Sequence, residues 1–236
     1  MSALEQRMLE IRDQFPALKQ KFGGNDFVYL DNTNTTLKPQ RVIDRIQKFY
    51  AEESSNVHRV GSKWSARTTG VCETAREEIA KFIGANSSDE MSVGRGATEG
   101  INLVAETFGH TFLKADDEIL ISEMEHHANI LPWHMLQERY RIKVRAVRIH
   151  DNGDLDLEDL KNKLNTKTKI VALTACSNTL GTITPVDKIV QIVRQGSSAA
   201  ILFDGAQLVS QKKVDVSAWD VDFFVFSSHK LFGPMG

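Results

Sequence analysis

The feature that most constrains this chain is a repeated alternation of short apolar runs with helical segments in its second half. The runs lie at 118–122, 143–149, 169–175, 200–203 and 223–226. They are too short for helices and rich in β-branched and aromatic residues, so we expect buried strands. Helical patterns separate them, and we expect Asp156 and Pro185 to begin two of those helices and Gly196 to end one. This order predicts an α/β fold with a mostly parallel sheet covered by helices on both faces.

The first half of the sequence predicts helices joined by polar segments. We expect an amphipathic helix at 2–15, a second at 39–53 and a third at 65–83 that stops at Gly84. A short strand at 91–94, a glycine turn and a helix over 101–108 follow. We divide the chain into an N-terminal helical arm, residues 1–25, and one large domain, residues 26–236.

Composition narrows the class of protein. Of the 236 residues, 41% are hydrophobic and 25% charged, and the formal net charge is −2, which is typical of a globular domain with one substantial core. A near-neutral chain without a basic cluster argues against nucleic acid as a partner. No apolar run reaches membrane-spanning length, and the charged N-terminus does not resemble a signal peptide. Cys72 and Cys176 form no metal or disulfide pattern, so we expect a reducing cytoplasm.

Polar residues follow the last two apolar runs directly. Asp204 directly follows the run 200–203, and Lys230 follows the run 223–226 within Ser-Ser-His-Lys. Ligands of open α/β sheets bind at the carboxyl ends of strands, so both side chains are expected to face one crevice. They could form a partly buried ion pair that joins two loops. Alternatively, Lys230 forms a Schiff base with the aldehyde of pyridoxal phosphate (PLP) while Asp204 pairs with the ring nitrogen. These two residues alone leave both interpretations open.

The segment from Gly94 to Gly100 joins the predicted strand 91–94 to a helix. A glycine-bearing turn at a helix N-terminus suits a phosphate, because free backbone N–H groups and the helix dipole both attract an anion. A dinucleotide fingerprint is a rival, with Glu123 at about the expected distance, although the strict G-x-G-x-x-G spacing is missed. A plain glycine turn is the third interpretation.

Two adjacent histidines, His126 and His127, follow the run 118–122. With Glu125 and His134 they could suggest a metal site, but the spacing is not HExxH, and adjacent histidines point apart. They could also cap the next helix without further role. A third interpretation places one imidazole over the face of a flat conjugated cofactor.

Taken together and in order, the motifs resemble the class V aminotransferase family of fold-type I PLP enzymes, especially SUF-type cysteine desulfurases and selenocysteine lyases. The resemblance extends from about residue 10 to the C-terminus, and it lies in seven segments: YLDNTNTTLKP (29–39), NVHR (56–59), RGATEGINLVAETFG (95–109), MEHHANILPW (124–133), SNTLGTITP (177–185), DGAQ (204–207) and FSSHKLFGP (226–234). It favours the PLP interpretation over the dinucleotide and metal ones.

The resemblance implies a role for each matching residue. Lys230 would be the Schiff-base lysine and proton shuttle, Asp204 would bind the ring nitrogen, and His126 would stack on the ring. Hydrogen bonds near the phenolic oxygen would come from Asn178 and Gln207. The phosphate would be held by Thr98, Ser227, His229 and the Ala97 N–H. The reaction implied is the conversion of cysteine to alanine, with sulfur passing to an enzyme thiolate as a persulfide.

The departures from the family concern the substrate side of the site. Thr33 and Asn34 stand where small residues are usual, and His58 would lie near the substrate. The family's second half, with its nucleophilic cysteine, substrate-binding arginine and small C-terminal domain, has no counterpart in these residues. We expect buried structural thiols at Cys72 and Cys176. We also expect an N-terminal portion of a longer enzyme, whose sheet lacks the strand that the family places between 223–226 and 91–94.

The leading hypothesis is therefore a cysteine desulfurase-like PLP enzyme acting on cysteine or selenocysteine, as a homodimer with a possible sulfur-acceptor protein. Transaminase or epimerase activity would be alternatives within the same family. A different class is a catalytically silent PLP-fold module that binds a partner. A nicotinamide-dependent oxidoreductase using the turn at 94–100 is the remaining alternative.

Overall fold

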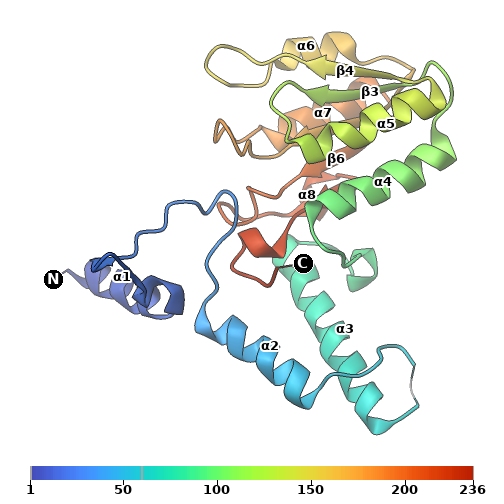
Figure 1. The fold of residues 1–236 in the computed structure, drawn as a ribbon. Helices are drawn as coiled ribbons and strands as arrows, with labels where there is room; N and C mark the ends of the chain where they lie inside the picture. The colour runs from blue at the N-terminus through green and yellow to red at the C-terminus, as the bar shows by residue number, and fades with distance from the viewer. Residues whose placement is uncertain (1, 60, 236) are drawn as a thin grey trace. The chain divides into compact units, whose positions relative to one another are not determined.

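The fold is seen in a computed structural model that describes residues 2–59 and 61–235 (Figure 1). The chain divides into two compact units. We call residues 1–80, 87–91 and 228–236 the helical unit, and residues 81–86 and 92–227 the sheet unit. The two are described separately, and the predicted boundary at residue 25 stays a prediction.

The sheet unit is built on five parallel strands in the order β4-β3-β5-β6-β7. Their bounds are Glu118–Ser122 (β3), Lys143–Val147 (β4), Thr168–Thr174 (β5), Ala200–Asp204 (β6) and Phe223–Val225 (β7). Each begins and ends within two residues of the run that predicted it, and all four pairings are parallel. The predicted parallel α/β fold is confirmed.

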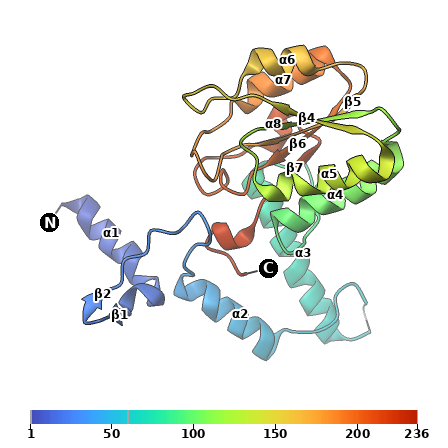
Figure 2. The same ribbon diagram turned by 45° about the horizontal axis from the view of Figure 1, so that its top comes forward.

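Helices cover both faces of this sheet, as Figure 2 shows. One face carries α4 (Ala97–Phe112) and α5 (Leu131–Tyr140), and the other carries α6 (Leu157–Lys163) and α7 (Val186–Gly196). A short helix, α8 (Val216–Trp219), was not predicted. The core beneath α4 and α5 is apolar and centred on fully buried side chains, among them Ile101, Ile119, Trp133, Ile170 and Leu202.

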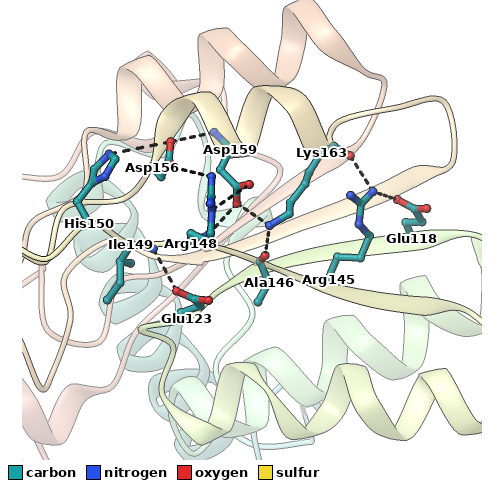
Figure 3. A network of polar contacts seen from close by, with 10 residues as sticks. All are labelled: Glu118, Glu123, Arg145, Ala146, Arg148, Ile149, His150, Asp156, Asp159 and Lys163. Atoms are coloured by element: carbon teal, nitrogen blue, oxygen red, sulfur yellow. Dashed lines mark hydrogen bonds and ion pairs between the residues drawn. The ribbon is translucent and has the colours of Figure 1, made fainter.

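The two ends of the sheet are treated differently. At β4, two side chains of α6 bind backbone groups of the strand and of the residue after it. Lys163 Nζ donates to the Ala146 carbonyl (2.6 Å), and Asp159 accepts from the N–H of Arg148, which directly follows β4 (2.9 Å) (Figure 3). Charged side chains on an edge strand discourage pairing with another chain. At the other end, β7 pairs with β6 alone among the described strands.

The predicted strand at 91–94 is wrong: Met91–Gly94 has no regular secondary structure. A strand persists only when its backbone groups pair with a neighbour, and none of the described strands pairs with this segment. The glycine-bearing turn and the helix that follow it are present, because α4 begins directly after Gly96.

The helical unit contains α1 (Ala3–Asp13), α2 (Gln40–Glu52) and most of α3 (Lys63–Ile83). All three were predicted, and Gly84 ends α3 with a positive φ of 71°. Ser2 forms a capping box with Glu5 at the start of α1. A two-residue hairpin, β1 (Lys21–Phe22) with β2 (Asn25–Asp26), was not predicted; it turns on the left-handed pair Gly23 and Gly24.

The apolar stripe of α1 does not bury a helix face within the described residues. None of its residues is buried, and Leu4 and Met8 are 72% and 61% exposed. The periodicity therefore predicted the helix correctly without predicting what its apolar side contacts. Across the described residues, no helix combines the length and apolar character needed to cross a membrane.

Candidate functional site

Four predicted site residues lie at the carboxyl ends of adjacent strands in the sheet unit. His126 follows β3, Asn178 follows β5, Asp204 ends β6 and Ser227 follows β7. Because β3, β5, β6 and β7 are successive parallel neighbours, the four residues succeed one another along one edge of the sheet. The carboxyl edge of such a sheet is where ligands bind.

The N-terminus of α4 approaches the end of β7. The Ala97 N–H donates to Ser227 Oγ at 2.8 Å, and both residues are buried. Gly96, the residue before the helix, has φ 136° and ψ −173°, a conformation that glycine alone adopts readily. A Cβ there would lie 2.8 Å from Ser227 Oγ. Thr98 is exposed in the first turn, so hydroxyl groups and a helix N-terminus lie close together here, and this chemistry suits a phosphate. That these residues hold a phosphate stays a prediction.

Asp204 is a buried carboxylic acid, only 5% exposed, paired in register with Thr174 of β5. Its Oδ1 accepts a hydrogen bond from the Ala206 N–H at 2.9 Å. The following Gly205 lies against the ring of Phe224, where a Cβ would come within 2.1 Å of the ring carbon. Gln207 is half-buried in the next turn. A buried acid at a strand end suits a protonated ring nitrogen, which offsets the cost of burying the charge.

His126 lies in the turn between β3 and α5, with its side chain exposed. Its Nδ1 accepts a hydrogen bond from the Ala128 N–H at 3.1 Å. An acceptor role for Nδ1 leaves the proton of a neutral imidazole on Nε2. An exposed ring held by its own turn can cover a flat ligand at the sheet edge.

The sequence analysis did not predict the position of Glu125 in the site. It considered this residue only as a metal ligand. Its carboxyl is buried and accepts hydrogen bonds from Ser122, Asn129 and the backbone of Thr174. Burial raises its pKa to about 7; these hydrogen bonds oppose the rise and the charge of Asp204 adds to it. The signal in the sequence was the placement of an acid directly between a buried strand and His126.

The lysine segment belongs to the helical unit, where η4 (Ser228–Lys230) is held by residues 35–38. The His229 carbonyl accepts from the Thr36 N–H and Oγ1 (2.9 Å each) and from Lys38 Nζ (2.8 Å). Burial, with the charges of Lys230 and Lys38, lowers the pKa of the His229 imidazole. Lys230 is half-buried. That it faces the same crevice as Asp204 stays a prediction.

The predicted substrate residues Thr33, Asn34 and His58 also lie in the helical unit, and all three are exposed. Asn34 Nδ2 donates to both carboxylate oxygens of Asp31, at 2.8 and 3.0 Å. His58 has φ 60°, and its Nε2 lies 3.5 Å from a carboxylate oxygen of Glu73. Their role stays a prediction.

The two cysteines differ in burial. Cys176 is buried, as predicted, and burial raises the pKa of its thiol. Cys72 was expected to be buried in a helix; it lies in α3 but is only partly buried, because it falls in the part of that helix, residues 69–79, where no residue is buried. A thiol with a raised pKa is a poor nucleophile at neutral pH.

Comparison with known proteins identifies this arrangement. The family model described as "Aminotransferase class-V" matches residues 28–236. The chain belongs to the class-V aminotransferase family. Within that family it is 45% identical to a cysteine desulfurase of Synechococcus elongatus, covering 96% of this chain and 36% of the relative. It is 46% identical to a probable cysteine desulfurase of Vibrio cholerae, covering 96% and 56%.

Solved structures of cysteine desulfurases share the fold. The cysteine desulfurase CsdA from Escherichia coli matches with a TM-score of 0.85 and 34% identity, over 97% of this chain and 56% of that one. The apo cysteine desulfurase from Thermococcus onnurineus NA1 matches with a TM-score of 0.88 and 33% identity, over 97% and 55%. The chain thus spans between about a third and somewhat over half of the length of these relatives.

Proposed function

We propose that this chain carries the PLP-binding part of a cysteine desulfurase-like enzyme, which converts L-cysteine to L-alanine and transfers the sulfur. The observation that carries the proposal is the row of His126, Asn178, Asp204 and Ser227 along adjacent strand ends, with the α4 N-terminus bonded to Ser227. Relatives over 40% identical to this chain are named cysteine desulfurases, which supports that reaction over others of the family.

In this proposal each part of the cofactor is bound by different residues. The N-terminus of α4, with Ala97 and Thr98, holds the phosphate together with Ser227 and His229. Asp204 pairs with the ring nitrogen, His126 covers the ring face, and Asn178 and Gln207 donate to the phenolic oxygen. Bound PLP supplies an electron sink for breaking bonds at the substrate Cα.

Lys230 supplies the amine that anchors the cofactor and then moves a proton at the substrate Cα. The amine must be neutral to accept that proton. His126 and Lys230 are the two catalytic residues of the proposal. The substrate sulfur passes to an attacking thiolate. Burial raises the pKa of the Cys176 thiol, which makes this residue poorly suited to that role.

The proposal also covers the substrate, the oligomeric state, the compartment and the sulfur acceptor. The substrate is cysteine or selenocysteine, with Thr33, Asn34 and His58 near it. The enzyme acts as a homodimer in the cytoplasm and passes sulfur to an acceptor protein. The large domain begins at about residue 26, after a helical arm.

The decisive experiment adds PLP to the chain and reduces it with borohydride, which traps a Schiff base irreversibly. We expect an absorbance band of bound cofactor and a PLP-sized mass addition on the peptide that contains Lys230. Lys230→Ala should lose both, whereas Lys213→Ala, which removes an exposed lysine of the sheet unit, should keep both. Labelling of the wild type and Lys230→Ala to the same extent would contradict the proposal.

A catalytically silent PLP-fold module is the second candidate, motivated by the polar pair Thr33-Asn34 where the family usually has small residues. It predicts the trapped Schiff base without turnover. Release of sulfide and alanine from cysteine distinguishes the two candidates: turnover that depends on Lys230 excludes the silent module.

A further inference from the structure

Three donors converge on the buried carboxyl of Glu125. Oε1 accepts from Ser122 Oγ and from the Thr174 N–H (2.9 Å), and Oε2 accepts from Asn129 Nδ2 (2.7 Å). Both oxygens of the carboxyl group act as acceptors here, and the Ser122 hydroxyl could also accept from a protonated carboxyl, whereas an amide at this position would turn its NH2 group toward a donor. The hydrogen bonds therefore suit a carboxyl group rather than an amide at this position.

The donors belong to three different elements of the sheet unit. Ser122 ends β3, Thr174 ends β5, and Asn129 ends the 3-10 turn η3 (His127–Asn129). Asn129 also donates to the Ala172 carbonyl (3.1 Å) and accepts from Nε1 of the fully buried Trp133 (3.0 Å). Glu125 thus joins the turn that bears His126 to β5 and, through Asn129, to α5.

Glu125 also lies within electrostatic range of Asp204. Thr174, whose N–H binds the Glu125 carboxylate, is the register partner of Asp204 on the adjacent strand. The Asp204 charge raises the pKa of Glu125, after the larger effect of burial. A negative charge favours the protonated form of any titratable group near it. An ionised Glu125 therefore raises the pKa of a group that binds beside Asp204.

We propose that Glu125 is a positioning residue of the cofactor site: its carboxylate fixes the turn that presents His126, and its charge, added to that of Asp204, favours a protonated ring nitrogen. The inference rests on the proposed function. This role would explain why an ionisable residue occupies the buried position 125, where burying an apolar residue would cost less free energy.

The first test needs no cofactor and uses Glu125→Gln, with Glu123→Gln as matched control. Glu123 is an exposed carboxylate two residues away that accepts from the Ile149 N–H at 3.2 Å. The folded-state pKa of Glu125 is raised from 4.5 to about 7, so its ionisation opposes folding. The wild type should lose stability as the pH rises through this window, relative to Glu125→Gln.

Urea unfolding of each cofactor-free variant from pH 5 to 8 measures this effect. We expect the ratio of the wild-type to the Glu125→Gln folding constant to fall on the order of 50-fold over that range. Glu123→Gln should follow the wild type at every pH. Should Glu125→Gln not fold, the side-chain carboxyl carbon of Glu125 in the wild type is titrated by NMR. A midpoint at the ordinary glutamate value would overturn the buried-charge part of the inference.

The second test adds PLP and separates positioning from folding. We expect Glu125→Gln to bind PLP roughly tenfold more weakly than the wild type and to change the visible circular dichroism, which reports ring orientation. The pH midpoint of the bound chromophore should fall by about 0.5, because a negative charge is lost; loss of packing alone would not predict that direction. Glu123→Gln should match the wild type in all three measurements.

The outcomes distinguish the two proposals. If the wild type binds PLP and Glu125→Gln matches it in affinity, circular dichroism and pH midpoint, the inference about Glu125 fails and the proposed function stands. If the wild type takes up no PLP, the proposed function fails and the inference fails with it.

Discussion

At Gly96 the backbone itself shapes the candidate phosphate site, because no side chain fits. Its φ of 136° lies in a region that costs other residues of order 1–3 kcal/mol. A Cβ there would lie only 2.8 Å from the neighbouring Ser227 Oγ. This conformation lets α4 begin directly beside the end of β7, so that the Ala97 N–H reaches Ser227.

We expect Gly96→Ala to lower the free energy of unfolding by about 1–3 kcal/mol and to weaken PLP binding. Urea titration and cofactor titration measure the two effects. Gly70→Ala is the control: Gly70 lies in α3, and a Cβ there meets nothing within 4 Å. It should raise stability by about 0.5–1 kcal/mol. Equal effects of the two substitutions would show that the conformation of Gly96 is not required.

Among the elements, α4 and α5 are joined by close apolar packing as well as by two exposed polar contacts, Arg139 to Glu106 and His110 to the Tyr140 hydroxyl (2.9 Å each). Gly109 of α4 faces Leu136 of α5, and a Cβ at 109 would lie 2.7 Å from Leu136 Cδ1. Leu136 is 1% exposed, so its neighbours leave it little room to move. This contact holds α5, and with it the turn of His126, against the core.

We expect Gly109→Ala to destabilise the chain by about 1–3 kcal/mol through overpacking and Leu136→Ala by about 2–5 kcal/mol through a cavity. The double variant should lose about 1 kcal/mol less than the two single losses together, since each change relieves the other. Urea unfolding of all four proteins measures the coupling. Additive losses would contradict direct packing, and Leu131→Ala, on an exposed position of α5, should change little.

At the scale of the whole molecule, residues far apart in sequence meet in the helical unit. Thr36, 4% exposed, donates to the His229 carbonyl 193 positions later and accepts from the Phe232 N–H at 2.8 Å. The segment that carries Lys230 is therefore held by the segment 35–38. Ordering the lysine segment requires the chain to close a long loop, and its local stability depends on these few contacts.

We expect Thr36→Val, which keeps the shape and removes the hydroxyl, to leave the Phe232 N–H unsatisfied at a cost of about 1–3 kcal/mol. Hydrogen exchange at residues 229–232 should accelerate, and Schiff-base formation at Lys230 should slow. Thr111→Val, on an exposed turn of α4 where the hydroxyl binds only its own helix, should leave both unchanged. Unchanged exchange in Thr36→Val would mean that other contacts hold the segment.

The sequence by itself determined the five strands of the sheet unit and the order in which they follow along the chain. Apolar runs of four to seven residues with polar ends predicted β3 to β7 within two residues, since burial on both faces leaves a local pattern. It also placed Asp204, Asn178 and Ser227 at strand ends, because those positions follow from where each run stops.

Only the tertiary structure decided what depends on partners distant in the chain. The segment 91–94 looked like a strand but has no strand paired with it, and the apolar stripe of α1 lies exposed in the described residues. The burial of Glu125 and its three donors arises from β3, β5 and η3 together, which no local pattern contains. Pairing, burial and charge depend on neighbours in space, and a local sequence pattern records only neighbours in the chain.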